Sequence, residues 1–289
     1  MSHPLSQSSQ FIYRFRGQTY DLSARTYVMG ILNITPDSFS DGGIYFDADR
    51  AIARGRQLGD EGADFIDIGG ESSRPGSEPI SEEEELRRVI PVIQRLAKDI
   101  SIPLSIDTYK SGVAERALDA GAQIVNDITG MTFDLRMMDV LRTFNACAII
   151  MHMKGTPRTM QQEPTYVDVT EEIARFLEER TERARDHGIA NVIVDPGIGF
   201  GKSLQHNLEL LKNLPRFAKL GYPLLVGPSR KSFIGKLLDA SVDDRLEGTA
   251  AAVTSSILRG ANIIRVHDVK EMKKVAIVAD ALKNDSVYP

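Results

Sequence analysis

The sequence has no tryptophan and only one cysteine, Cys147. A lone thiol cannot form a disulfide within the chain, so a framework held together by disulfides is excluded. Cys147 lies in the apolar run ACAIIM, which is typical of a buried residue. We therefore expect a protein of a reducing compartment, located in the cytoplasm.

Long apolar runs and a large excess of one charge are also missing. No stretch approaches the roughly 18 apolar residues that span a bilayer. The net charge of −5 argues against a general binder of nucleic acid or of a membrane surface. Residues 1–10 have neither the charged start nor the apolar centre of a secretory signal, and they lack the arginine of a transit peptide. We interpret them as a disordered leader.

The rest of the chain has enough apolar residues for a large core. The 289 residues are 42% hydrophobic and 26% charged, and no linker rich in proline and serine divides them. We therefore predict a single domain over residues 11–289. Residues 11–23 alternate apolar and polar side chains around Arg16-Gly17-Gln18, which predicts a β-hairpin.

A repeating pattern follows, in which short apolar runs alternate with longer segments of helical periodicity. The eight runs cover residues 27–33, 64–70, 103–107, 123–127, 147–151, 191–195, 223–227 and 262–266. Several of the helical segments end in a glycine that can supply a left-handed C-cap, namely Gly62, Gly121, Gly188 and Gly260. Runs that are apolar on both faces favour parallel strands covered by helices.

The number of these repeats favours one fold class. Eight β–α units in about 260 residues match a single TIM barrel. The alternative is a doubly wound sheet, but the G-x-G-x-x-G turn that often follows its first strand is absent. We predict an α/β fold, a TIM (β/α)8 barrel with an N-terminal β-hairpin.

Polar residues follow every predicted strand, where a TIM barrel has its active site. The opposite ends of the strands, such as Ile102-Pro103 and Tyr222-Pro223, carry little chemistry, and this asymmetry indicates an enzyme rather than a scaffold. Asp107, Asn126 and Asp195 suit a flat heterocycle that has N–H donors and a carbonyl. The alternative for the two aspartates is that each caps the helix after its strand.

A second set of rim residues is cationic and comprises Arg74, Lys231, Arg265 and His267. Arg265 and His267 are two residues apart and share one face of an extended segment, which suits a phosphate or diphosphate. The alternatives are a solvated loop pair for Arg230-Lys231 and a neighbour of a helix N-cap for His267. Asn33 offers a neutral oxygen that could help to ligate Mg²⁺ beside phosphates.

Several familiar motifs are missing. The sequence has no cluster with zinc-ligand spacing, no Ser-His-Asp arrangement and no P-loop. GIGFGK (197–202) is interpreted as a turn that holds Phe200 over the pocket. SEEEEL (81–86) fits the acidic first turn of a helix, favoured by the helix dipole, better than a metal site.

The polar segment after Asn33 is longer than a chain reversal needs. We interpret residues 35–43 as a mobile flap over the barrel mouth, with Phe39 as its one apolar anchor. The alternative is an ordinary loose surface loop.

Eight motifs in one order resemble those of the dihydropteroate synthases of the pterin-binding family. They are MGILNITPDSFSDGG, DIGGESSRPGS, SIDTYK, IVNDITG, MHMKGTPRTMQ, DPGIGFGK, GPSRKSFIG and IIRVHDV. The resemblance runs from about residue 28 to residue 278 and implies a TIM barrel. It implies a transferase that joins 6-hydroxymethyl-7,8-dihydropterin diphosphate to p-aminobenzoate, releasing diphosphate and 7,8-dihydropteroate for folate biosynthesis, with Mg²⁺ as cofactor.

The resemblance also implies roles for individual residues. The pterin would be held by Asp107, Asn126, Asp195 and Lys231, and the diphosphate by Asn33, Arg265 and His267, with Asn33 next to the metal. Ser73, Arg74, Phe200, Ser232 and Phe39 would shape the p-aminobenzoate end, which is also the sulfonamide subsite. Ser73 departs from the family's usual threonine. The catalytic set would be Asp107, Asp195, Lys231, Arg265 and His267.

The chemistry of these substrates favours an SN1-like course, in which diphosphate departs before the arylamine attacks. One alternative is a pterin-binding barrel that transfers a methyl group from methyltetrahydrofolate to a corrinoid. Another is a catalytically silent pterin-binding paralogue. We expect a chain with this one activity and a homodimer, for which the apolar segments 248–260 and 269–284 could supply the contact.

Overall fold

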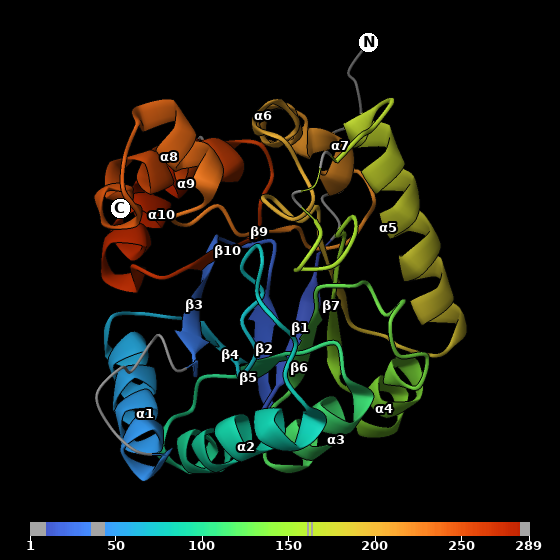
Figure 1. Cartoon of the computed structure of the whole chain (residues 1–289), viewed down its shortest axis with the longest axis vertical. Coiled ribbons are helices and arrows are strands. Elements are labelled where there is room, and N and C mark those ends of the chain that lie inside the picture. The colour runs from blue at the N-terminus through green and yellow to red at the C-terminus, as the bar shows by residue number, and fades with distance from the viewer. Residues whose placement is uncertain (1–9, 36–43, 161, 163, 284–289) are drawn as a thin grey trace.

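Eight short apolar segments form parallel strands around a common axis (Figure 1). The computed structural model describes residues 10–35, 44–160, 162 and 164–283. The strands are β3 (Tyr27–Asn33), β4 (Phe65–Gly69), β5 (Leu104–Asp107), β6 (Ile124–Asp127), β7 (Cys147–Met151), β8 (Val192–Asp195), β9 (Leu225–Val226) and β10 (Ile263–Val266). Their order in the sheet is β8-β7-β6-β5-β4-β3-β10-β9. A parallel bridge between Val194 and Leu224 joins its two edges, so the predicted barrel is confirmed.

Seven strands match their predicted runs to within one residue at each end, and β9 is the exception. Of the predicted run 223–227, only Leu225–Val226 forms a regular strand. Pro223 has no N–H to give to a ladder, although its carbonyl accepts from the Val194 N–H at 3.0 Å. The seam between β8 and β9 is therefore closed by the isolated bridge between Val194 and Leu224 rather than by a regular ladder.

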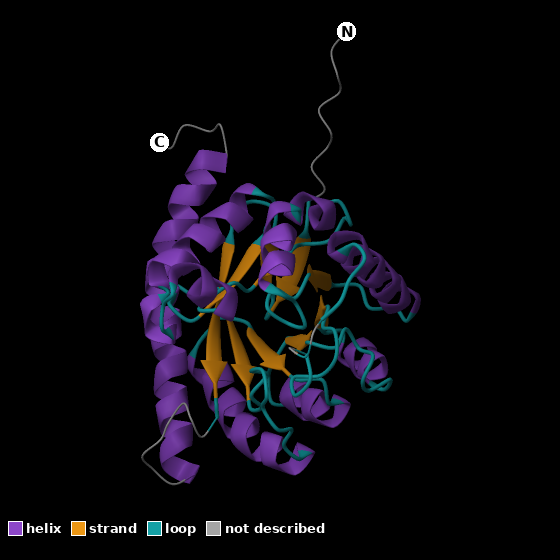
Figure 2. Ribbon diagram, turned by 45° about the horizontal axis from the view of Figure 1, so that its top comes forward, coloured by secondary structure: helices purple, strands orange, loops and turns teal. Residues whose placement is uncertain are grey.

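Helices surround the sheet (Figure 2). They are α1 (Ile44–Asp60), α2 (Glu82–Asp99), α3 (Ser111–Asp119), α4 (Met137–Phe144), α5 (Val169–Asp186), α6 (Leu204–Lys212), α7 (Leu214–Ala218), α8 (Ser232–Leu238), α9 (Leu246–Leu258) and α10 (Val269–Lys283), with one 3₁₀ turn, η2 (Val242–Asp244). The four glycines predicted as C-caps all have positive φ, between 82° and 114°. No helix in the described ranges is both long and apolar enough to span a membrane.

The main core lies between the barrel and its helices. Outward-facing strand residues such as Ile66, Ile68 and Ile106 pack with helix residues such as Val89 and Leu177, and all of these are fully buried. Helix α2 begins where its sequence predicts, because the Ser81 hydroxyl accepts the Glu84 N–H at 3.2 Å and four glutamates fill the first turn.

The predicted N-terminal hairpin closes the amino end of the barrel. It consists of β1 (Ile12–Phe15) and β2 (Gln18–Asp21), and both turn residues, Arg16 and Gly17, have positive φ. The Phe15 ring meets the Phe65 ring edge-on at 5.6 Å, and the Tyr13 hydroxyl donates to the Val192 carbonyl at 2.7 Å. The same apolar cluster contains the first inward-facing residue of most strands, so this end of the barrel is sealed.

Candidate active site

The inward-facing positions of the strands change from apolar to polar toward the carboxyl end of the barrel. Side chains alternate between the two faces of a strand, so Phe65 and Asp67 face inward in β4, as do Ile263 and Arg265 in β10. In neighbouring strands Asn33 pairs in register with Gly69, Gly69 with Asp107, and Asp107 with Asn126. The strand register alone therefore gathers the predicted polar residues at one level.

Arg265 is the centre of a buried group of charges. Its Nε donates to Asp67 Oδ2 at 2.6 Å, and its Nη2 donates to Asp107 Oδ2 at 2.7 Å. Asn126 Nδ2 donates to the same Asp67 oxygen at 2.9 Å. We call these four residues, Asp67, Asp107, Asn126 and Arg265, the charged centre. The resemblance places Arg265 with the diphosphate, and the structure shows that its guanidinium also contacts the predicted pterin ligand Asp107.

Asp67 was missed in the sequence because it stands inside an apolar strand. Its side chain is fully buried, and its second oxygen, Oδ1, has no hydrogen-bond partner within the described part of the chain. The same is true of Asn126 Oδ1. Buried acceptors rarely lack a hydrogen-bond partner, so these two oxygens indicate a site for a donor group. A ligand with N–H groups would satisfy them. The available signal was a carboxylate in a strand whose other positions are buried.

Burial shifts the pKa of each titratable group of the site in the direction that favours its uncharged form. It raises the pKa of Asp107 to about 7, against the opposing charge of Arg265, and that of Asp195 to about 6, against the hydrogen bond from the Gly197 N–H. Burial, together with Arg265, lowers the pKa of Lys231 to about 7 and that of His267 to about 3. The neutral His267 ring lies with Nδ1 3.0 Å from the Ser229 hydroxyl.

Neither aspartate serves as a helix cap, so that alternative is wrong. Lys110 stands at the N-cap of α3 and Ser203 at that of α6, whereas the Asp195 carboxylate accepts the Gly197 N–H at 2.7 Å. The alternative for Arg230 and Lys231 is a solvated loop pair. Arg230 is the partly exposed member, with 32% of its side chain exposed, whereas Lys231 lies over the Phe200 ring. Arg230 forms an ion pair with Asp268 at 2.7 Å.

Lys231 and Phe200 stack at the mouth. The Lys231 Nζ lies 3.9 Å from the centre of the Phe200 ring, in cation–π geometry. The residues on either side of Phe200 belong to the predicted GIGFGK turn, whose three glycines all have positive φ. Phe200 is buried, so the predicted turn is confirmed, and its placement of the ring over the pocket stays a prediction.

Lys202 and His152 are a second pair that sequence reasoning missed. Lys202 Nζ is buried, 3.1 Å from His152 Nδ1, and donates to the carbonyls of His152 and Phe200 at 3.2 and 2.8 Å. Burial lowers the pKa of His152 to about 2, so its ring is neutral. The pair ties the loop after β7 to the loop that carries Phe200.

The remaining predicted residues lie on the rim. Asn33 is half-buried, and a Cβ on Gly69 would lie 3.7 Å from its Oδ1 and 3.6 Å from Asp107 Cβ. Ser73 is half-buried, while Arg74 and Ser232 are exposed; in the described ranges none of the three forms a hydrogen bond or ion pair with the charged centre. Phe39 and most of the predicted flap lie outside the described residues.

A cavity of about 470 Å³ adjoins the rim between the loops after β4, β5, β6 and β7. Its walls are largely apolar and include Tyr109, Phe133, Met153 and Phe176. Glu71 forms part of the wall, with its carboxylate hydrogen-bonded to the Tyr109 hydroxyl. The cavity is separate from the charged centre.

Known proteins resemble this chain over most of its length. Residues 29–267 match the family of pterin binding enzymes. A dihydropteroate synthase of Synechocystis is 49% identical over 92% of this chain and 93% of its own length. The structure of Xanthomonas albilineans dihydropteroate synthase with 4-aminobenzoic acid covers 96% of this chain and 100% of its own, with 42% identity and a TM-score of 0.89. That of Yersinia pestis dihydropteroate synthase with a sulfonamide drug has 43% identity and a TM-score of 0.88, covering 94% of this chain and 99% of its own. This chain belongs to the family of pterin binding enzymes, among the dihydropteroate synthases.

Proposed function

We propose that this chain condenses 6-hydroxymethyl-7,8-dihydropterin diphosphate with p-aminobenzoate to give 7,8-dihydropteroate and diphosphate. The observation that carries the proposal is the charged centre, with Asp195 and Lys231 beside it, at the mouth of a barrel related to dihydropteroate synthases. Two carboxylates and an amide, held by one guanidinium, suit a ring with several N–H donors and a carbonyl.

The pterin ring would bind to Asp107, Asn126, Asp195 and Lys231, and we add Asp67 to this set. The unpartnered oxygens of Asp67 and Asn126 support the assignment because N–H groups of the ring would satisfy them. Ionised Asp107 and Asp195 would favour a ring that carries positive charge. Burial raises the pKa of both carboxylates, and the positive charge of such a ring would lower it again and so help them to ionise.

The diphosphate would lie toward Asn33, Arg265 and His267. Among the described residues no three His, Cys, Asp or Glu side chains gather to hold a metal ion. That fits Mg²⁺ held mainly by the diphosphate and water, with Asn33 as a neutral oxygen ligand. When bound, the metal would neutralise charge on the leaving group. Arg265 and His267 would bind and orient the diphosphate at the same end.

The p-aminobenzoate end would be shaped by Ser73, Arg74, Phe200 and Ser232, together with Phe39. The buried Phe200 ring, fixed by its glycine turn and by Lys231, supports this because it offers a rigid apolar face beside the pterin site. Departure of diphosphate would leave a delocalised pterin cation, which the amine lone pair attacks directly. The carboxylates stabilise charge at one end and the cations at the other. No strong general base is needed, because the amine attacks through its lone pair and the resulting ammonium is acidic enough to lose its proton to water.

One assay tests the reaction. Purified protein is mixed with Mg²⁺, the pterin diphosphate and p-aminobenzoate, and dihydropteroate is measured by chromatography. We expect product, and a complete lack of product with a folded protein would favour the silent paralogue. Calorimetry with diphosphate tests the residue roles: Arg265→Ala should weaken its binding more than that of p-aminobenzoate, and equal affinity would place the diphosphate elsewhere.

A homodimer is the proposed assembly. Helices α8, α9 and α10 are neighbours (Figure 1). Several large apolar side chains on these helices are exposed. They include Leu237, Leu238, Leu258, Ile277, Val278 and Leu282, each at least 44% exposed. Exposed apolar side chains on adjoining helices support self-association, which sedimentation equilibrium would measure. A cytoplasmic location and one domain over residues 11–289 complete the proposal; the buried free thiol of Cys147 supports the former.

A further inference from the structure

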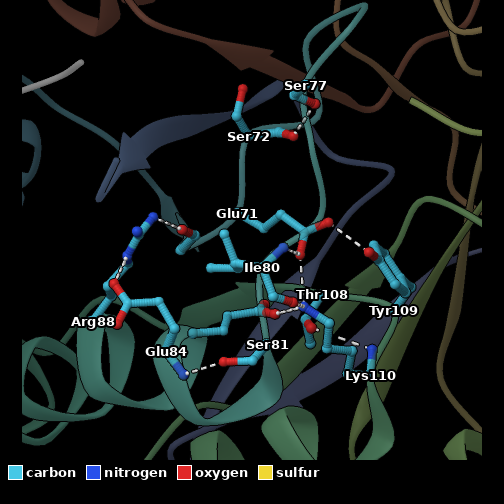
Figure 3. Close-up of polar contacts among 12 residues, drawn as sticks. Glu71, Ser72, Ser77, Ile80, Ser81, Glu84, Arg88, Thr108, Tyr109 and Lys110 are labelled. Carbon is cyan, nitrogen blue, oxygen red and sulfur yellow. Dashed lines mark hydrogen bonds and ion pairs between the residues drawn. The ribbon is translucent and has the colours of Figure 1, made fainter. Parts of the chain in front are cut away.

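The loop after β4 has a root that is held by buried charges (Figure 3). We define the rim loop as residues 72–79, which carry Ser73 and Arg74, and its root as Glu71 and Ile80. The two residues of the root contact each other directly, because Glu71 Oε2 accepts the Ile80 N–H at 3.1 Å. The Arg88 guanidinium of α2 also donates to the carbonyl of Gly70, next to the root, at 2.9 Å.

Lys110 binds both residues of the root. Its Nζ donates to Glu71 Oε2 at 2.6 Å, to Glu85 Oε2 at 2.6 Å and to the Ile80 carbonyl at 2.9 Å. Three acceptors match the three N–H donors of one ammonium group. Lys110 therefore holds both ends of the rim loop and fastens them to α2 through Glu85.

These charges are almost completely shielded from water. The side chains of Glu85, Glu71 and Lys110 are only 2%, 9% and 13% exposed. Burial alone would lower the pKa of Lys110, but its hydrogen bonds to Glu71 and Glu85 raise it above the usual value. The lysine therefore stays charged, and without it two buried carboxylates would repel each other.

The same segment of chain reaches the charged centre. Asp107, which pairs with Arg265, is followed two and three residues later by Tyr109 and Lys110. The Tyr109 hydroxyl donates to Glu71 Oε1 at 2.5 Å, so the carboxylate is held through both oxygens. The short segment after β5 thus connects the proposed pterin site with the root of the rim loop.

Outside the root, the rim loop is held by an exposed ion pair between Glu78 and Arg158, 3.5 Å apart, and by a few hydrogen bonds. The Ser77 hydroxyl donates to the Ser72 and Arg74 carbonyls at 2.5 and 2.8 Å, and the Gly76 N–H donates to the Pro157 carbonyl at 3.0 Å. The first two bonds only fix the shape of the loop. Its position relative to the barrel therefore depends largely on the root.

We propose that Lys110 is a positioning residue for the second substrate: by fastening the root formed by Glu71 and Ile80, it places Ser73 and Arg74 over the p-aminobenzoate end of the site. The inference rests on the proposed function for the identity of that substrate. It concerns one end of the site, because Asp107 and Asn126 have their own contacts with Arg265 and Asp67, to which the Lys110 ammonium group does not contribute.

The test compares Lys110→Met, Glu71→Gln and Tyr109→Phe with a matched lysine variant, Lys273→Met. Lys273 forms a similar ion pair, 2.8 Å from Asp64, at the amino end of β4 and far from the rim loop. We expect Lys110→Met to raise the KM for p-aminobenzoate about tenfold or more while the KM for the pterin diphosphate changes less than about twofold. Glu71→Gln should follow with a smaller rise, then Tyr109→Phe, and Lys273→Met should leave both KM values unchanged.

A merely structural role would lower the unfolding temperature of Lys110→Met without separating the two KM values. Unchanged or parallel KM values would therefore overturn the proposal. Should Lys110→Met fail to fold, the same split in Glu71→Gln decides, since that variant keeps the size of the side chain.

Hydrogen exchange separates this inference from the proposed function, because it requires no turnover. In Lys110→Met the amides of Gly76, Ser77 and Ile80 should exchange at least about tenfold faster than in the wild type and in Lys273→Met. If the wild type makes no dihydropteroate but this exchange is faster, the reaction is wrong and the positioning of the loop stands. Unchanged exchange overturns the positioning whatever the activity.

Discussion

The two ends of the barrel are built from inward-facing residues of the same strands, yet one end is apolar and the other is charged. At the amino end, aromatic and aliphatic side chains from the hairpin and the strands pack into a sealed cluster. At the carboxyl end the same strands present Asp67, Asp107, Asn126 and Arg265. There burial raises the pKa of Asp107, and one oxygen each of Asp67 and Asn126 has no hydrogen-bond partner among the described residues. One end therefore adds stability, and the other gives some of it up for chemistry.

The largest expected effect breaks the carboxyl end. Asp107→Ala removes one of the two carboxylates that hold Arg265 and a proposed ligand of the pterin. We expect turnover to fall by about 10²–10³-fold, the usual result of removing a group that stabilises charge in a transition state. Steady-state assays measure this, with circular dichroism to confirm folding. Near-normal turnover in a folded variant would remove Asp107 from the site.

The next prediction breaks the amino end and leaves the chemistry alone. Phe15→Ala removes a ring that is 2% exposed and packs on Phe65 and Tyr20. It should lower the free energy of unfolding by about 3–5 kcal/mol. Urea unfolding measures that loss. At urea concentrations where the variant is still folded, its kcat/KM should change less than about twofold. A large fall in kcat/KM would show that the two ends are coupled.

A third prediction sharpens the comparison, because removing the charge of Asp195 should make the protein more stable. Burial raises the Asp195 pKa from 3.8 to about 6, so the folded state holds its proton more tightly than the unfolded state. The stability contributed by this group is full below pH 3.8 and is lost as the pH rises through 6. Asp195→Asn removes the cost of the charged form, so we expect it to raise the free energy of unfolding by about 2–3 kcal/mol at pH 8.

The gain should shrink by about half at pH 5, where folded Asp195 is largely protonated. Turnover should be lost at every pH. Asp127→Asn is the matched control, since burial also raises the pKa of Asp127 to about 6, but this residue has no proposed role. It should show a similar gain in stability and keep its activity. A gain for Asp195→Asn that does not depend on pH would contradict the assigned cause.

The smallest expected effect concerns the rim. Ser73→Thr restores the methyl group that the family usually has, and one buried methyl is worth about 0.8 kcal/mol. The KM for p-aminobenzoate should therefore change by no more than about fourfold, with that for the pterin unaffected. Steady-state kinetics measure both constants. A change above about twentyfold would mean that Ser73 lies in a tighter subsite than its half-exposed position indicates.

The sequence predicted the parts of this molecule that depend on local pattern. Short apolar runs, helical periodicity and the four capping glycines located the barrel strands and the helices, and alternation of apolar and polar residues located the hairpin. The carboxyl ends of the strands gave the candidate site. The reason is that a barrel converts chain order into spatial order. The β9 strand is shorter than predicted because Pro223 removes a donor from its first position.

The residues that were missed act through partners distant in sequence. Asp67 is 198 residues from Arg265, and Lys202 is 50 residues from His152. Lys110 resembles a surface residue until Glu71 and Glu85 are placed beside it. The acidic run 81–86 was correctly interpreted as a first helical turn, but pattern alone did not separate Glu85, which is buried, from its solvated neighbours. Such pairings need the tertiary structure.

The seal at the amino end has a consequence for synthesis of the chain. Tyr13 in the hairpin bonds to Val192, 179 residues later. At about 5–20 residues per second, a ribosome needs roughly 10–40 s to make the intervening chain. During that time the hairpin's aromatic face has no β8 to cover it. The hairpin is made first, but its apolar face is covered only when the later strands are in place, so the growing chain exposes an apolar surface that chaperones can bind.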